Sequence, residues 1–99
     1  DAVPAGTAAY CVTDYAALGL YQEAARRGIA IPEELSVIGF DNMPFGELLS
    51  PPLTSVNQHK AALGKCAAEV MLRQLDQRFA PEAFRLDTEL VIRQSVTLR

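Results

Sequence analysis

The sequence predicts an α/β domain built on a parallel β-sheet. Residues 7–12 and 36–40 form two short, mainly apolar stretches, which is typical of strands buried in a sheet. Residues 15–27, between them, have apolar side chains at helical spacing. A strand, a helix and a strand in this order make a βαβ unit, in which the two strands are parallel and the crossover is right-handed.

The composition is that of an ordinary folded domain. The chain has 99 residues, of which 49% are hydrophobic and 21% are charged, a balance that argues against disorder. The net charge of −3, without a run of Lys or Arg, excludes this part alone as a nucleic-acid-binding surface. No apolar stretch approaches the roughly 20 residues of a membrane helix. The start resembles no signal peptide and lacks an initiator Met, so we expect the chain to be part of a longer protein.

The helix at 15–27 has clear start and stop signals. Thr13 and Asp14 precede it, and either side chain can cap its first turn. Gly28 follows it as the expected left-handed stop. The side chains expected to share its apolar face are Ala17, Leu18, Tyr21, Ala24 and Ala25.

The second half of the chain predicts two more extended segments around one long helix. Residues 53–58 follow Pro51-Pro52, a pair that stops any helix and favours extended chain. A helix is expected at 59–79, ended by residues 80–82, and a last strand at 86–92. The apolar stripe of the long helix consists of Leu63, Ala67, Val70, Met71 and Leu75.

Residues 43–50 form a loop or a short helix with much apolar surface for a connector. Two interpretations stay open. The segment either folds back onto the core or contacts a second subunit, because an exposed apolar cluster usually marks contact with a partner.

The two cysteines stand in different elements without metal-ligand spacing. Cys11 lies in the first predicted strand and Cys66 on the long helix. We expect buried free thiols, which suit a reducing cytosol, and we expect no cofactor.

Polar side chains follow the predicted strands. Thr13 and Asp14 come after the first strand and Asp41 after the second, so a parallel sheet brings these three residues to one edge. Ligands of open α/β sheets bind outside this carboxyl edge. Together with Gln58, these residues fit the reversible binding of a polyhydroxylated or nitrogenous small molecule. The alternative for Asp41 is a simple turn cap.

Enzymatic chemistry finds little support in the sequence. Gly39 and Gly46 do not fit a phosphate-binding loop, and Ser36 lacks the flanking glycines of a nucleophile elbow. Asp14 and Asp41 could bind Mg²⁺ or act as acid and base, but no nucleophile or further ligand accompanies them. We assign no catalytic or metal-ligating residue and do not expect an enzyme.

Five stretches, in order along nearly the whole chain, resemble one family. They are residues 10–19, 28–42, 51–58, Gly64 with Ala67-Ala68, and 90–95. Together they look like the C-terminal part of the effector-binding domain of a LacI/GalR-family transcriptional regulator.

The resemblance implies a Rossmann-like lobe of a periplasmic-binding-protein-like type I fold. Two α/β lobes hold an effector between them, and their closure changes the operator affinity of a separate helix-turn-helix head. Residues 1–58 and 90–99 then belong mainly to the C-terminal lobe, and 59–89 cross to the N-terminal lobe. The DNA-binding head is expected outside this chain, and the long helix is expected to lack much of its packing here.

The resemblance also implies roles for single residues. Effector-binding positions match Thr13, Asp14, Asp41 and Gln58, with Asp41 as the hydrogen-bond acceptor and Asp14 as a position that also fits a structural role. Dimer-interface positions match Leu18, Gln22, Phe45, Leu48 and Leu49.

The implied partners are a sugar or nucleobase-like effector, a second copy of the chain, and operator DNA through the separate head. The expected location is the cytoplasm, without a membrane. The alternative that shares the fold is a periplasmic sugar-binding protein for uptake.

Overall fold

A four-stranded sheet in the order β1-β2-β3-β4 carries the fold. The computed structural model describes residues 4, 6–76 and 83–97. Its elements are β1 (Thr7–Tyr10), α1 (Asp14–Arg27), β2 (Leu35–Phe40), the 3₁₀ helix η1 (Pro44–Leu48), β3 (Thr54–Asn57), α2 (Lys60–Gln74) and β4 (Glu89–Val91).

The first three strands are parallel, which confirms the predicted βαβ arrangement. β1 pairs with β2 from Thr7 opposite Leu35 to Tyr10 opposite Ile38. β2 pairs with β3 in the same direction, and β4 returns antiparallel to β3. The carboxyl ends of β1, β2 and β3 therefore meet at one edge of the sheet.

Local signals in the sequence determine the ends of α1. The Thr13 hydroxyl caps it by accepting a hydrogen bond from the N–H of Ala16 at 3.1 Å. Gly28 ends it with a φ of 71°, a conformation that glycine adopts without the steric cost of a Cβ. The helix begins at Asp14, one residue earlier than expected.

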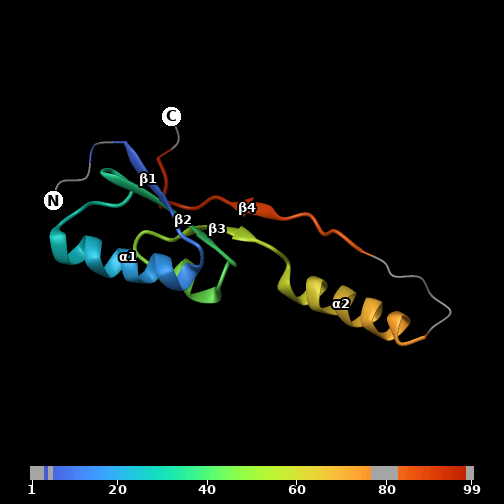
Figure 1. Ribbon diagram of the computed structural model, residues 1–99. Coiled ribbons are helices and arrows are strands. Elements are labelled where there is room, and N and C mark those ends of the chain that lie inside the picture. The colour runs from blue at the N-terminus through green and yellow to red at the C-terminus, as the bar shows by residue number, and fades with distance from the viewer. Residues whose placement is uncertain (1–3, 5, 77–82, 98–99) are drawn as a thin grey trace.

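The core lies between α1 and one face of the sheet (Figure 1). Its buried apolar side chains are Ala17, Tyr21, Leu35, Val37 and Leu53. The hydroxyl of Tyr21 also donates to the carbonyl of Pro51 at 2.8 Å, which ties the helix to the loop before β3. Two residues expected on the apolar face are not buried in the core. Leu18 is only half-buried and Ala25 is exposed.

The predicted first strand is shorter and less buried than expected. β1 ends at Tyr10, so that Cys11 follows the strand, and its side chains alternate between half-buried and exposed. Tyr10 is 70% exposed and Val12 is 80% exposed. The physical reason is that the described part of the chain covers only one face of the sheet with a helix. β2 shows the same alternation, with every second residue buried.

The helix α2 extends away from the sheet (Figure 1). It runs from Lys60 to Gln74 and buries none of its side chains, so its predicted apolar stripe is not covered by the described part of the chain. The expected end of this helix at 77–82 lies outside the described residues. β4 covers only Glu89–Val91 of the expected 86–92. No helix in the described ranges is both long and apolar enough to span a membrane.

Candidate functional site

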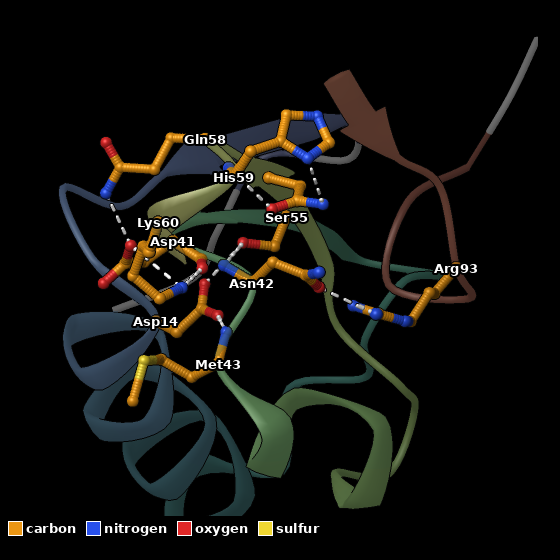
Figure 2. A network of polar contacts seen from close by, with 10 residues as sticks. Asp14, Asp41, Asn42, Met43, Ser55, Gln58, His59, Lys60 and Arg93 are labelled. Atoms are coloured by element: carbon orange, nitrogen blue, oxygen red, sulfur yellow. Dashed lines mark hydrogen bonds and ion pairs between the residues drawn. The ribbon is translucent and has the colours of Figure 1, made fainter. Parts of the chain in front are cut away.

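Three parallel strands bring the candidate site together at their carboxyl edge. Thr13 and Asp14 follow β1, Asp41 follows β2, and Gln58 follows β3. Figure 2 shows Asp14, Asp41 and Gln58 in one network of polar contacts. The predicted convergence of these positions at one sheet edge is therefore what the fold produces.

Asp41 presents its carboxylate at this edge. The side chain is 26% exposed. Its Oδ1 accepts a hydrogen bond from the amide of Gln58 at 2.7 Å. Lys60, in the first turn of α2, places its Nζ 3.3 Å from the same oxygen and also donates to the carbonyl of Asp41. Sequence analysis did not identify Lys60, which gains its role only from the place where α2 begins.

The hydrogen bond from Gln58 is the largest cause that holds the pKa of the Asp41 carboxyl below its ordinary value of 3.8. Partial burial acts in the opposite direction, and the hydrogen bond and the charge of Lys60 are two further causes that lower this pKa. Asp41 is therefore a carboxylate at neutral pH, ready to accept hydrogen bonds from hydroxyl or N–H donors.

The turn that carries Asp41 is strained. Asp41 has a φ of 113° and Asn42 a φ of 54°. Positive φ values in residues other than glycine cost on the order of 1–3 kcal/mol each and persist only when the surroundings hold them. Such strain is common where a side chain must be aimed at a ligand.

The side chain of Asp14 supports the turn at residues 41–43 through hydrogen bonds. Its side chain is fully buried. Oδ2 accepts from the N–H of Met43 at 2.7 Å, and Oδ1 accepts from the hydroxyl of Ser55 at 2.7 Å. Ser55 in turn accepts from the N–H of Asn42 at 3.0 Å. One carboxylate on α1 thus supports two consecutive amides of the turn.

Asp14 lies at the predicted sheet edge, but its side chain is buried in the protein. A fully buried carboxylate whose two oxygens both accept protein hydrogen bonds presents no surface to an effector in this conformation. Asp14 has the structural role that sequence analysis gave as the alternative to effector contact. Ser55, which sequence analysis did not select as a site residue, connects Asp14 to the turn.

Gly39 leaves the space that the Asp14 carboxylate fills. A Cβ at this position would lie 2.1 Å from Oδ1 of Asp14 and 3.0 Å from Cδ2 of Leu53. Sequence analysis placed Gly39 in the second strand and excluded it from a phosphate-binding loop, without giving it a role. Its role is to let a strand pass directly beside a buried charge.

Arg93 reaches the turn from its other side. Its Nη2 donates to Oδ1 of Asn42 at 2.8 Å, and its Nη1 donates to the carbonyl of Leu53 at 2.6 Å. The only sequence signal for Arg93 was a cation directly after the last strand, which says nothing about a partner 51 residues away.

Thr13 and the two cysteines make no contact with the Asp41 carboxylate among the described contacts. The Thr13 hydroxyl caps α1, and a contact of Thr13 with an effector stays a prediction. Cys11 and Cys66 are free, half-buried thiols. Burial, with a further contribution from the charge of Asp14, raises the pKa of the Cys11 thiol above 9.0, so Cys11 is not a ready nucleophile at neutral pH.

A hollow of about 420 Å³ lies beside the ends of β1 and β2. It is lined by Tyr10, Cys11, Val12 and Phe40. Within the described ranges, no three His, Cys, Asp or Glu side chains come close enough to hold a metal ion. The chemistry that the arrangement offers is the acceptance of hydrogen bonds by a charged carboxylate next to apolar surface, which suits reversible binding.

The side chains expected at a dimer interface lie on α1 and around η1. Leu48 is 85% exposed, whereas Leu49 packs against the core. Leu18 and Phe45 are half-buried and Gln22 is exposed. The ring centroids of Tyr15 and Phe45 lie 5.2 Å apart, so α1 and η1 form one continuous surface.

Comparison with known proteins gives the family. The family model described as "Periplasmic binding protein-like domain" matches residues 2–96. The chain belongs to this family, which agrees with its mixed α/β architecture and mostly parallel sheet.

Individual relatives are transcriptional regulators. The chain is 41% identical over 91 residues to the HTH-type transcriptional repressor PurR of Vibrio parahaemolyticus, a match that covers 91% of this chain and 27% of that protein. The chain thus spans about a quarter of the length of the curated relatives it matches.

Solved structures agree with this result. A LacI family transcriptional regulator from Enterococcus faecium with bound ribose superposes with a TM-score of 0.84 at 33% identity, covering 91% of this chain and 34% of that one. A LacI family regulator from Enterococcus faecalis, also with bound ribose, gives a TM-score of 0.84 at 36% identity over 91% of this chain and 34% of that one. The resemblance stated from the sequence is confirmed, and these relatives do not favour a receptor for uptake.

The lowered pKa of Asp41 leads to a testable prediction. Replacing Gln58 by Ala removes the largest single cause of the lowering and should raise the pKa of Asp41 toward 3.8. Because the native pKa is lowered, the stabilisation from this pairing is present above the ordinary pKa and is lost as the pH falls through the native value. Carbon-13 NMR of the Asp41 carboxyl measures its pKa in the native protein and in the Gln58→Ala variant, and an unchanged pKa would contradict the assignment.

The close approach at Gly39 leads to a second prediction. Gly39→Ala forces the Asp14 carboxylate out of its place and should destabilise the intact protein by about 1–3 kcal/mol, the range of overpacked cores. Gly19→Ala is the matched control, since nothing lies within 4 Å of a Cβ there and alanine favours a helix by roughly 0.5–1 kcal/mol. Urea unfolding measures both. Equal stability of the two variants would show that the Asp14 site tolerates the methyl group.

Proposed function

We propose that this chain is the effector-binding portion of a LacI-type transcriptional regulator, and that Asp41 is the main hydrogen-bond acceptor for the effector. The effector is a small molecule with hydroxyl or N–H donors, a sugar or a nucleobase. Its binding shifts the population of closed lobes, and that shift changes operator affinity in a helix-turn-helix head beyond this chain. Such a regulator acts in the cytoplasm.

The geometry of Asp41 is the observation that carries the proposal. The carboxylate is charged, partly exposed and held on a strained turn at the carboxyl edge of the sheet. Among the described contacts, Gln58 and Lys60 both use Oδ1, and none uses Oδ2. The second oxygen is therefore the natural acceptor for an effector donor, while Gln58 holds the carboxylate from the side.

The relatives support the class of effector. Two regulators of similar structure hold ribose, and another similar regulator is solved as a complex with cellobiose. Polyols of this kind offer several hydroxyl donors, which a carboxylate accepts well. The apolar hollow beside Phe40 is suited to the less polar face of a ring.

The shape of the chain supports the proposed division between lobes. α2 leaves the sheet, buries none of its side chains and exposes Met71 and Leu72, and Leu75 directly after its end is exposed as well. An apolar helix of this kind needs a partner. We propose that residues 59–89 cross to the other lobe and pack there, and that β4 brings the chain back.

Asp41→Asn tests the proposed acceptor in the intact protein. Asn tolerates positive φ and keeps an oxygen for Gln58, but it removes the charge. Hydrogen bonds to a charged group are worth about 1.5–3 kcal/mol, so effector affinity should fall by about 10- to 150-fold. Isothermal titration with D-ribose, cellobiose, adenine and guanine measures this loss, and operator binding in the same solutions measures the response of the regulator.

The matched control for Asp41→Asn is Glu33→Gln. Glu33 is an exposed carboxylate just before β2, at the other end of that strand, and its loss should leave affinity within twofold. An unchanged dissociation constant for Asp41→Asn would remove Asp41 from the effector site. Sugar binding without any operator binding by the intact protein would instead favour a receptor for uptake.

The dimer surface gives a second test of the proposal. Leu48→Lys places a charge where 85% of an apolar side chain is exposed, so it should weaken a dimer at least tenfold without disturbing the core. Leu49 is the poorer choice because it packs against the core. Ala30→Lys, which adds the same charge at an exposed position beyond the other end of α1, is the control. Sedimentation equilibrium that gives equal dimer affinities for both variants would place the interface elsewhere.

A further inference from the structure

Arg93 is an almost buried cation that, among the described contacts, does not touch the Asp41 carboxylate. Its side chain is 14% exposed, while that of its ion-pair partner Glu47, 3.5 Å away, is 72% exposed. A nearly buried guanidinium beside one exposed carboxylate needs further acceptors. Arg93 finds them in the carbonyl of Leu53 and the side chain of Asn42.

The fork of Arg93 spans two segments at once. Nη1 binds the chain before β3 at Leu53, and Nη2 binds the strained turn after β2 at Asn42. The planar guanidinium fixes the directions of both hydrogen bonds, which an ammonium group on a flexible stem does not do. Arg93 thereby links Asn42 to the entry of β3, in addition to the bond from the N–H of Asn42 to Ser55.

The backbone around Arg93 is itself firmly held. Its N–H donates to Oγ1 of Thr54 at 2.8 Å. Two residues on, the buried Ser95 hydroxyl donates to the carbonyl of Val37 at 2.6 Å and accepts from the N–H of Thr54 at 2.8 Å. Arg93 therefore projects from a segment that is bonded to both β2 and β3, and its head group has little freedom to drift.

The side chain of Arg93 lies on the opposite side of the turn from Gln58. Figure 2 shows Arg93 pointing to Asn42 from one side, while Gln58 and Lys60 approach Asp41 from the other. Among the described contacts, Arg93 reaches the neighbour of Asp41 and not Asp41 itself.

We propose that Arg93 is a positioning residue of the effector site, which holds Asn42 in its left-handed conformation and so aims the carboxylate of Asp41. This inference rests on the proposed function in so far as Asp41 binds the effector. Effector affinity then depends on a side chain that makes no contact with the effector and lies in the segment that follows β4.

Hydrogen exchange in the intact protein tests the positioning role without any ligand. The N–H of Asn42 bonds Ser55 and that of Met43 bonds Asp14, so both amides report the order of the turn. Arg93→Gln should speed their exchange at least tenfold relative to the N–H of Tyr21 in α1. Glu47→Gln is the control, because an exposed ion pair contributes little, and it should change the same ratio less than twofold.

Affinity for a named probe gives the second readout. Arg93→Gln should weaken binding of D-ribose, or of guanine if titration finds that base bound instead, by at least fivefold. Asn42→Gly removes the acceptor and relieves the strain, so in that background Arg93→Gln should cost less than twofold. Such non-additivity is the signature of two residues that act through each other.

Three results would overturn the inference. They are unchanged exchange of the turn amides, exchange that rises equally in α1 and in the turn, and an Arg93→Gln cost that is the same in the wild-type protein and in the Asn42→Gly variant. Failure of the proposed function looks different, because the wild-type protein would then bind none of the probes. In that case the exchange ratio still decides whether Arg93 orders the turn.

Discussion

The buried carboxylate of Asp14 is the interaction on which the rest of the structure depends. Burying an isolated charge is costly, and a protein retains one only where hydrogen bonds and fields compensate it. Here the N–H of Met43 and the hydroxyl of Ser55 supply the hydrogen bonds. Asp14 is also the first residue of α1, where the helix dipole favours a negative charge. Gly39 provides the space. One side chain thus joins a helix, the end of β2 and the middle of the sheet.

This constraint leads to a division of work between two acidic residues that both follow a strand. Asp14 is fully buried and satisfies backbone and hydroxyl donors. Asp41 is partly exposed and has an oxygen that no described contact uses. The strained turn links the two residues. Asp14 supports the amides of Asn42 and Met43, and this support keeps Asp41 at the edge of the sheet. Binding sites gain precision when the groups that touch a ligand are held by a second set of groups that do not.

Much of the fold could be predicted because its signals are local. Thr13 and Gly28 mark the ends of α1, and the apolar stretch after Pro32 marks β2. The parallel order of the strands then brought Thr13, Asp14 and Asp41 to one edge. The sequence could not distinguish the role of Asp14 from that of Asp41, because each is an aspartate after an apolar strand. The difference between them comes from the register that places Gly39 beside Ser55, and register is not visible in one strand.

The contacts that sequence analysis missed are all long-range. Arg93 and Asn42 are separated by 51 residues, and Asp14 and Ser55 by 41. The exposure of α2 and of Tyr10 has another origin, since a helical or strand pattern predicts an apolar face but not whether this chain supplies its cover. Likewise, Leu48 and Leu49 are the same residue type next to each other, but Leu48 is the exposed last residue of η1, whereas Leu49 is extended and packs against the core.

The most direct test is a crystal structure of the intact protein with its effector bound. We expect an effector hydroxyl or N–H within hydrogen-bond distance, about 3 Å, of Oδ2 of Asp41, with Asp14 still bonded to Met43 and Ser55. An effector that sits between the lobes without touching Asp41, or one that is bound by a reoriented Asp14, would contradict the roles assigned to these two carboxylates.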